Sequence, residues 1–280
     1  MKILTWNIQA TKGCDSVFDS SRIINEIMRF GPVDVICLQE VARHIPSLGF
    51  EDQVTIISNQ FPEFDAHWAP GFSVPDKSGT RSEFGNLTLV RKPLLNNARI
   101  HTLPSPLIEG LQIPRTMAEV VVGGEQFEFS IFNAHLAFHS SVERIEQLKA
   151  LTLLRDQIVA KCGLSTNRNA TGPFSYADSI QSVILCGDLN VSSESNEFKE
   201  HITGRNWVDC WDVQNDTHAI EKTNRQPTCG CYDHIQWTEG PHIRDYFLVT
   251  ENIADKTISV DVNVETDASD HQPVLLEIAL

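Results

Sequence analysis

The chain has 280 residues, of which 41% are hydrophobic and 21% charged, a balance typical of a globular protein with a substantial core. It contains no apolar stretch of about 18 residues or more, which argues against a membrane span. The formal net charge of −15 repels polyanions and lowers the expectation of a processive nuclease. A metal ion and a local arginine can still reverse the field inside one cleft.

The chain shows no linker, and both of its ends carry motif segments, so we expect one catalytic domain over residues 1–280. The N-terminus enters a strand at once and leaves no room for a signal peptide, which predicts a cytoplasmic protein. Seven cysteines, an odd number, agree with a reducing compartment. Cys229 and Cys231 form the one close pair, and His234 alone does not complete a metal site beside them. No obligate protein partner is evident.

In chain order, an apolar run at residues 2–6 predicts the first strand, and a helix follows with Asp19 or Ser20 as its N-cap and Gly31-Pro32 at its end. Further helices are expected at residues 51–59, 140–162 and 196–202. Further strands are expected at residues 33–38, 64–68, 86–91, 98–103, 116–122, 126–133, 182–186, 246–250, 258–262 and 273–278. Residues 70–83 and 163–179 are interpreted as exposed loops, and 213–242 as irregular.

Gly123-Gly124 between two β-rich runs predicts a hairpin whose two turn residues both have positive φ. Strands outnumber helices, come in hairpins and have helices interspersed among them. This pattern predicts an α/β fold of the α+β type, with two mainly antiparallel sheets packed face to face and helices outside.

Five segments end or follow an apolar run in a polar residue that can hold a metal or a phosphate. Four of them look like buried strands and the fifth leads into the last strand. They are Ile3–Asn7, Val35–Glu40, Ile131–His135, Val183–Asn190 and Ser269–His271. Strand ends that are far apart in sequence can converge on one edge of a fold and form a site for a hard metal with an acid–base partner.

Glu40 and Asn7 are the first candidates for metal ligands. Alone, Glu40 is more simply interpreted as a helix-start residue. Together with Asn7 on a neighbouring strand, it would supply oxygen ligands suited to Mg²⁺ or Mn²⁺.

Asp188 and Asn190 follow a buried strand and Gly187, two residues apart, and can point the same way if the chain stays extended. The Asp could align a water while the Asn amide donates to a phosphoryl oxygen. An Asx turn that closes the strand explains the pair equally well.

Asp270 and His271 are adjacent, so their side chains should serve different partners: a metal for Asp270, and a phosphate oxygen or a proton for His271. His271 needs a second carboxylate to fix its tautomer. Asp245 opens a clear apolar strand and is preferred, with Asp233 as the alternative. Taken alone, His271 is more commonly interpreted as an exposed loop histidine.

Arg115 precedes one hairpin strand and His135 ends the other, so the hairpin would bring them together on one phosphate. Arg115 is also compatible with a rim position or a salt bridge. Nucleotide-binding glycine loops, a serine-nucleophile elbow and the zinc-protease motif are absent from the sequence.

In this order the motifs Thr-Trp-Asn-Ile-Gln, Leu-Gln-Glu-Val, Asn-Ala-His-Leu, Gly-Asp-Leu-Asn and Ser-Asp-His-Gln-Pro-Val resemble the endonuclease/exonuclease/phosphatase superfamily, which includes deoxyribonuclease I relatives. The chain resembles small bacterial members of it most. The resemblance implies a four-layer α/β/β/α sandwich that cleaves phosphoester bonds with a bound metal.

Carried over to this sequence, the resemblance makes Glu40 the principal metal ligand, assisted by Asn7 and Asp270. Asp188 would orient or deprotonate the attacking water, and Asn190 would hold a phosphate oxygen. His271, oriented by Asp245, would stabilise the transition state. His135 would contact the phosphate or protonate the leaving group. Asn86 would lie on a substrate-contacting strand, and Glu83 would support His135. Arg244 replaces the Ile that precedes the late-strand Asp in many members, which keeps Asp233 open.

These expectations describe a Mg²⁺- or Mn²⁺-dependent phosphodiesterase or phosphatase. The alternative within the class is a DNA or RNA nuclease, which should show a basic rim with exposed aromatic residues. A non-catalytic binding module on the same scaffold would have lost at least one motif residue, and none is lost. The choice between a small molecule and a nucleic acid as substrate stays open.

Overall fold

A computed structural model describes residues 1–124, 127–162, 180–217 and 225–279. Its strands form two six-stranded mixed sheets, in the orders β11-β12-β1-β2-β4-β3 and β5-β6-β7-β8-β10-β9. The strands of the first sheet are β1 Lys2–Asn7, β2 Val35–Arg43, β3 Phe64–Pro75, β4 Arg81–Arg91, β11 Thr257–Val262 and β12 Val274–Ile278. Those of the second are β5 Leu95–Thr102, β6 Thr116–Gly123, β7 Glu128–His135, β8 Ser182–Asp188, β9 Trp207–Asp209 and β10 Asp245–Thr250.

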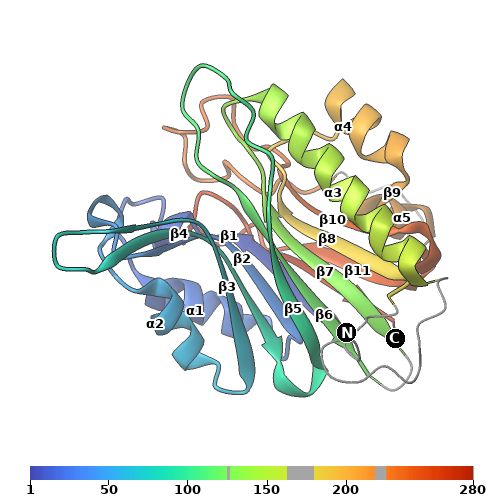
Figure 1. Cartoon of the computed structure of the whole chain (residues 1–280), viewed down its shortest axis with the longest axis horizontal. Helices are drawn as coiled ribbons and strands as arrows, with labels where there is room; N and C mark the ends of the chain where they lie inside the picture. Colours follow the sequence, from blue (N-terminus) through green and yellow to red (C-terminus); the bar gives the residue numbers. More distant parts are fainter. Residues whose placement is uncertain (125–126, 163–179, 218–224, 280) are drawn as a thin grey trace.

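Helices lie outside both sheets (Figure 1). The α-helices are α1 Ser20–Arg29, α2 Gln53–Gln60, α3 Ser141–Cys162, α4 Asn196–His201 and α5 Cys210–Thr217. Short 3-10 helices occupy Gln9–Thr11, Pro46–Leu48, Lys92–Leu94, Thr203–Arg205 and Glu251–Lys256. In the part of the chain that the structure describes, no helix is long and apolar enough to span a bilayer.

Three apolar layers hold the sandwich together. Residues such as Val35, Val120 and Phe247 fill the space between the sheets. Ile23 on α1 packs on the outside of the first sheet, and Leu148 on α3 on the outside of the second. Alternate residues of one strand therefore serve two cores, as a period of two requires. The predicted sandwich of two mainly antiparallel sheets with helices outside is confirmed.

A buried polar contact joins the two sheets in the middle of the apolar layer. The amide of Gln39 on β2 donates to Asn133 Oδ1 on β7 at 2.7 Å. Asn133 in turn donates to Thr88 Oγ1 at 3.0 Å, and to the carbonyl oxygens of Leu38 and Leu87. Buried amides are retained only when they are hydrogen-bonded, so this contact fixes the position of one sheet over the other.

Three local predictions were wrong. Residues 70–83 are not one continuous loop, because β3 reaches Pro75 and β4 begins at Arg81, which leaves only residues 76–80 as a turn. Proline is tolerated there since β3 is an edge strand and its register shifts between Pro70 and Phe72.

The β6–β7 hairpin forms, but neither Gly123 nor Gly124 has positive φ, because the connection extends to Phe127. The stretch 213–242 is not wholly irregular, because α5 continues to Thr217. The predicted loop at 163–179 lies outside the described residues.

Candidate active site

The polar residues singled out in the sequence meet at one edge of the sandwich. β1 is parallel to β2, and β7 is parallel to β8, so the C-terminal ends of each pair lie together. β10 runs antiparallel to β8 and begins where β8 ends, with Asp245 opposite Asp188. The residues that gather there are Asn7, Glu40, His135, Asp188, Asp245, Asp270 and His271.

Glu40 lies inside a strand rather than past its end, which corrects the sequence expectation. β2 continues to Arg43, but its register with β4 shifts between Leu38 and Val41. Glu40 has a φ of +54° within this bulge, a conformation that a residue with a side chain rarely adopts. Bulges of this kind re-aim side chains next to active sites. The bulge leaves Glu40 Oε1 3.0 Å from Asn7 Nδ2.

Asp188 is the centre of the cluster. Its Oδ2 accepts a hydrogen bond from Asn7 Nδ2 at 3.0 Å and lies 3.4 Å from His135 Nε2 and 3.6 Å from His271 Nε2. Gly187 makes this placement possible. It has a φ of +125°, and a Cβ at this position would lie 2.0 Å from the carbonyl oxygen of Ala134 on the paired strand.

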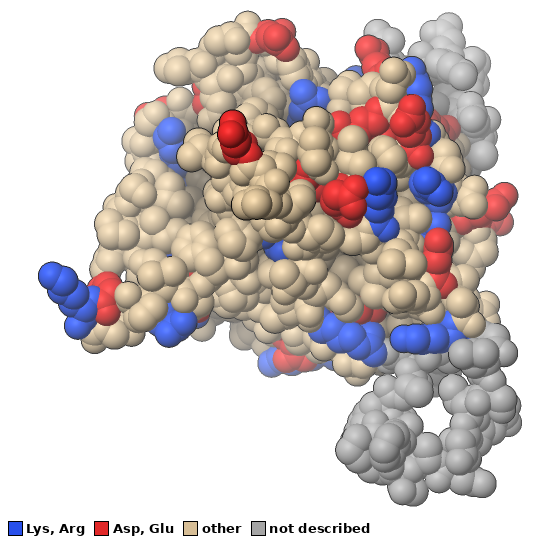
Figure 2. Space-filling model, turned by 45° about the horizontal axis from the view of Figure 1, so that its top comes forward, with Lys and Arg blue, Asp and Glu red and all other residues tan. Residues whose placement is uncertain are grey.

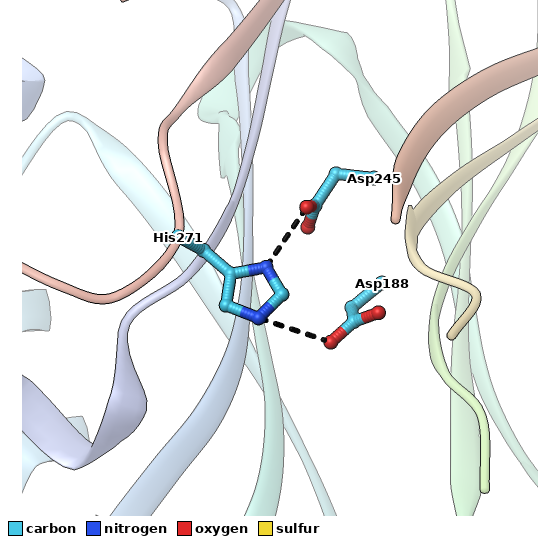
Figure 3. A group of neighbouring side chains, drawn as sticks. All are labelled: Asp188, Asp245 and His271. Carbon is cyan, nitrogen blue, oxygen red and sulfur yellow. Dashed lines mark hydrogen bonds and ion pairs between the residues drawn. The ribbon is translucent and has the colours of Figure 1, made fainter. Parts of the chain in front are cut away.

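His271 is held between two carboxylates (Figure 3). Its Nδ1 lies 2.8 Å from Asp245 Oδ2, and its Nε2 faces Asp188. The buried hydroxyl of Thr228 donates to the same Asp245 oxygen at 2.7 Å. Asp233 instead accepts the backbone N–H groups of Ile235 and Gln236, as a turn residue. The structure thus places Asp245, rather than Asp233, against His271.

The side-chain amides of Asn190 and Asn86 both donate hydrogen bonds to backbone carbonyl oxygens. The chain does not stay extended after Asp188, because Asn190 has a φ of +53° and its backbone N–H donates to Asp188 Oδ1 at 2.9 Å. The Asn190 side chain donates to Leu136 O at 3.0 Å. The Asx turn weighed for this pair is therefore present. Asn86 donates to Thr116 O at 2.8 Å.

Arg115 and Asn86 line a narrow hollow together with His135. Within the described residues, the Arg115 guanidinium makes no hydrogen bond or ion pair at contact distance, although Glu40 and Asp188 attract it. It is therefore available to an anion. Glu83 does not reach His135, contrary to expectation, because Arg43, Trp68 and Ser73 hold its carboxylate.

Asp270 is positioned by residues that the sequence did not reveal. Its Oδ2 accepts hydrogen bonds from Gln236 Nε2 at 2.8 Å and from Trp237 Nε1 at 3.0 Å. The ring of Trp237 also meets the ring of His271 edge to face at 5.7 Å. These residues and Thr228 come from a stretch without periodicity, and no spacing rule distinguishes them from ordinary loop residues.

The two histidines are driven to opposite protonation states. Burial disfavours the charged form of His271, but Asp245, Asp188 and Asp270 outweigh it and raise its pKa well above the ordinary value. For His135, burial and then the charges of Arg115 and His271 lower the pKa well below that value. One histidine is thus a cation and the other neutral at pH 7, which separates an electrostatic role from a proton-transfer role.

The site carries more negative than positive charge. Glu40, Asp188, Asp245 and Asp270 face two cationic groups, His271 and Arg115. Burial, followed by the charge of Asp270, raises the pKa of Glu40. Burial also raises the pKa of Asp188 to about 7, against the opposing charge of His271. An excess of carboxylate with raised pKa values is the environment that a divalent cation relieves.

Two groupings could hold such a cation. Donor atoms of Asp188, Asp245 and His271 lie within 4.8 Å of one another. Both ring nitrogens of His271 face carboxylates there, and its pKa is raised, so a metal at this position would have to displace a proton from the ring. Glu40 and Asp270 fit better, because Glu40 Oε2 has no partner among the described residues and the two carboxylates repel each other. Asn7 turns its NH₂ group to Glu40 and Asp188, and would have to rotate its amide to offer a cation its oxygen.

Solved structures similar to this chain share its fold. An endonuclease/exonuclease/phosphatase from Beutenbergia cavernae aligns with a TM-score of 0.67 and 21% identity, over 99% of this chain and 70% of that one. A mannosyl-6-phosphatase from Bacteroides thetaiotaomicron has a TM-score of 0.67 and 17% identity over the whole of both chains. The human Nocturnin catalytic domain has a TM-score of 0.64 and 16% identity, over 99% of this chain and 93% of that one.

No curated protein sequence matches the chain. A family model does, over residues 4–271, a span that runs from the first strand to His271 and includes every strand end described above. The resemblance drawn from the five motifs is confirmed, and the chain is an enzyme of the phosphoester-cleaving class. It belongs to the endonuclease/exonuclease/phosphatase family.

Proposed function

We propose that this enzyme is a divalent-metal-dependent phosphoester hydrolase in which water attacks the phosphorus in line, without a covalent intermediate. The observation that carries the proposal is the Asp188–His271–Asp245 arrangement beside an unneutralised pair of carboxylates, Glu40 and Asp270. A bound Mg²⁺ or Mn²⁺ would supply charge neutralisation at the phosphoryl oxygens. Glu40 and Asp270 would hold it, with Asn7 beside them.

Asp188 is suited to orient the attacking water and take its proton. Its Oδ2 faces three polar groups without an intervening apolar side chain, and its pKa of about 7 matches a general base at neutral pH. Asn190 keeps the carboxylate oriented through its backbone N–H.

His271 and Arg115 are suited to bind the phosphoryl oxygens. The imidazolium of His271 is fixed by Asp245, so its positive charge is in place before the transition state forms. Arg115 directly precedes β6, next to the end of β7 that carries His135, and lies in the hollow that Asn86 lines. Neutral His135, 3.4 Å from Asp188, can contact the phosphate or pass a proton to the leaving group.

A nuclease within the same family would need a cationic surface to hold a polynucleotide. The net charge of −15 opposes this, and Arg81, one of the few candidates, donates to Ser73. We therefore place a small phosphodiester or phosphomonoester ahead of DNA or RNA.

A panel of phosphomonoesters, phosphodiesters and oligonucleotides, assayed with Mg²⁺ and with Mn²⁺, tests the proposal. The variants Glu40→Ala and His271→Ala should lose activity by about three orders of magnitude or more while remaining folded. Turnover close to wild type in either variant would remove the assignment.

A further inference from the structure

Exposed apolar side chains occur on three segments that carry or adjoin residues of the candidate active site. We call them the apolar rim; they come from residues 103–115, residues 136–142 and residues 225–244. Three of them are almost fully exposed, with relative accessibilities of 102% for Leu107, 76% for Leu111 and 92% for Ile235. Ile113, Phe138 and Val142 are between 39% and 56% exposed and complete the rim.

The rim is continuous with the catalytic residues. Phe138 meets the ring of Trp237 at 6.3 Å, and Trp237 meets the ring of His271 at 5.7 Å. Ile235 directly precedes Gln236, whose amide donates to Asp270. Ile113 lines the hollow that holds Arg115. A molecule that lies on the rim therefore also reaches the site.

Polar contacts hold these segments with their apolar side chains turned outward. Gln112 Nε2 donates to Pro106 O at 2.9 Å and to Glu143 Oε2 at 3.1 Å, which fastens residues 103–115 to the start of α3. Gln147 Nε2 adds a bond to Pro104 O at 3.1 Å. On the other side of the site, Asp233 caps the turn that carries Ile235. The rim side chains are thus exposed because hydrogen bonds fix the conformation of the loops that carry them.

Few charges accompany two of the three rim segments. Residues 103–115 contain Glu109 and Arg115 as their only Asp, Glu, Lys or Arg, and residues 136–142 contain none, with His139 as their one titratable side chain. Residues 225–244 contain Arg225, Asp233, Glu239 and Arg244, of which Arg225 pairs with Asp209 and Asp233 caps the turn of Ile235. Figure 2 turns the loops at the top of Figure 1 toward the viewer. In this view, most of the left and centre of the surface is uncharged, and charged side chains gather on the right. A polyanion finds little attraction here, whereas protruding Leu, Ile and Phe beside a site suit insertion into a lipid boundary.

We propose that the apolar rim docks the enzyme on an electrically neutral lipid surface and that its substrate is a lipid phosphodiester presented by that surface. This inference rests on the proposed function, because it brings the phosphate of a lipid headgroup to Asp188, His271 and Arg115. The negative charge of the chain favours zwitterionic over anionic lipid.

Vesicle binding tests the docking without catalysis. Phosphatidylcholine vesicles are sedimented with the protein in EDTA, so that no turnover occurs. The variant Leu107→Ser/Leu111→Ser/Ile235→Ser should bind about a hundredfold more weakly than wild type. The control, Met28→Ser/Ile100→Ser/Ile258→Ser, removes the same number of apolar side chains, each about half exposed, from α1, β5 and β11 and should bind like wild type. Added phosphatidylglycerol should weaken binding.

Hydrolysis separates this inference from the proposed function. With Mg²⁺, the rim variant should cleave a soluble diester such as bis(p-nitrophenyl) phosphate at the wild-type rate, but vesicle lipid at least about tenfold more slowly. If wild type binds vesicles and hydrolyses no ester, the proposed function fails while the docking stands. If wild type cleaves the soluble diester and does not bind vesicles, the inference is overturned. Equal losses on both substrates, or a dimer that the rim variant dissociates, would overturn it as well.

Discussion

Two buried clusters combine carboxylate with histidine, one within the second sheet and one where both sheets end, yet the pKa shifts of their carboxylates are opposite in sign. On β5, β6 and β7, Glu119 Oε1 accepts from Arg99 at 3.0 Å and from Ser130 at 2.8 Å, and its Oε2 lies 2.6 Å from His101. Burial alone would raise the pKa of Glu119, but these partners lower it. At the candidate site, Asp188 and Glu40 keep raised pKa values despite their partners.

The difference separates a structural cluster from a functional one. Around Glu119, one carboxylate meets enough donors to be stable when charged, so folding completes the cluster. Around Asp188, the chain assembles more carboxylate than its own cations neutralise, which is costly unless a ligand completes the set. Surplus charge, rather than burial or the presence of histidine, marks the site.

The largest effect is expected from removing one of the carboxylates that the site's own cations do not neutralise. Glu40→Gln should lower kcat by about three orders of magnitude, because the carboxylate proposed to hold the metal is gone. Without metal the variant should melt a few degrees above wild type, since one repelling charge has been removed. The Tm with and without Mg²⁺ checks both points, and a Mg²⁺-induced rise in the variant would contradict the ligand role.

Asp245→Asn should lower kcat by about 10²- to 10⁴-fold, because His271 loses the group that orients and charges it. NMR titration should show a lower pKa for His271 than in wild type. Asp233→Asn is the matched control, since Asp233 serves only its own turn, and should leave activity unchanged. The reverse result would transfer the orienting role to Asp233.

Asp188 should control the acid side of the pH profile. A base must be deprotonated, so kcat/KM should rise with pH and level off above the pKa of about 7. A bound cation moves this limb to lower pH. Measurements at several Mg²⁺ concentrations reveal the shift, and a profile that stays flat from about pH 5 to 8 would exclude Asp188 as the base.

The smallest effect on activity is expected from a substitution in the cluster around Glu119. Glu119→Gln should cost about 1–3 kcal/mol of unfolding free energy, with kcat close to wild type. Because the pKa of Glu119 is lowered on folding, its contribution is present above the unfolded pKa of about 4.3 and lost as pH falls through the folded value. Denaturant titration at neutral and acid pH measures it. A large loss of activity would erase the contrast between the clusters.

Much of this molecule could be predicted from its sequence. Period-two runs and helix caps identified the layers, because each strand divides its apolar residues between two cores. Asp19, predicted as a helix cap, accepts the N–H of Ser21 at the start of α1. The strand-end residues were found because parallel pairs bring their ends together, a consequence of topology that local sequence already implies.

The remainder depends on contacts between segments that share no pattern. The bulge at Glu40 arises from how β2 pairs with β4, and the sequence of β2 alone reads as a strand that stops early. Trp237, Gln236 and Thr228 support the site from an irregular segment, where neither periodicity nor turn chemistry assigns a partner. Side-chain hydrogen bonds of this kind are visible only once the loop has been placed.

The amide contact between Gln39 and Asn133 has a mechanical consequence. Glu40 and Asn7 belong to one sheet and Asp270 to the loop before its strand β12, whereas His135, Asp188 and Asp245 belong to the other sheet. Apolar faces resist separation but offer little resistance to shear, and a slide of less than one ångström would misalign the proposed base and the groups around it. A directional hydrogen bond at 2.7 Å resists that slide. The Gln39–Asn133 hydrogen bond inside the core thereby keeps the proposed catalytic residues of the two sheets aligned at the edge of the sandwich.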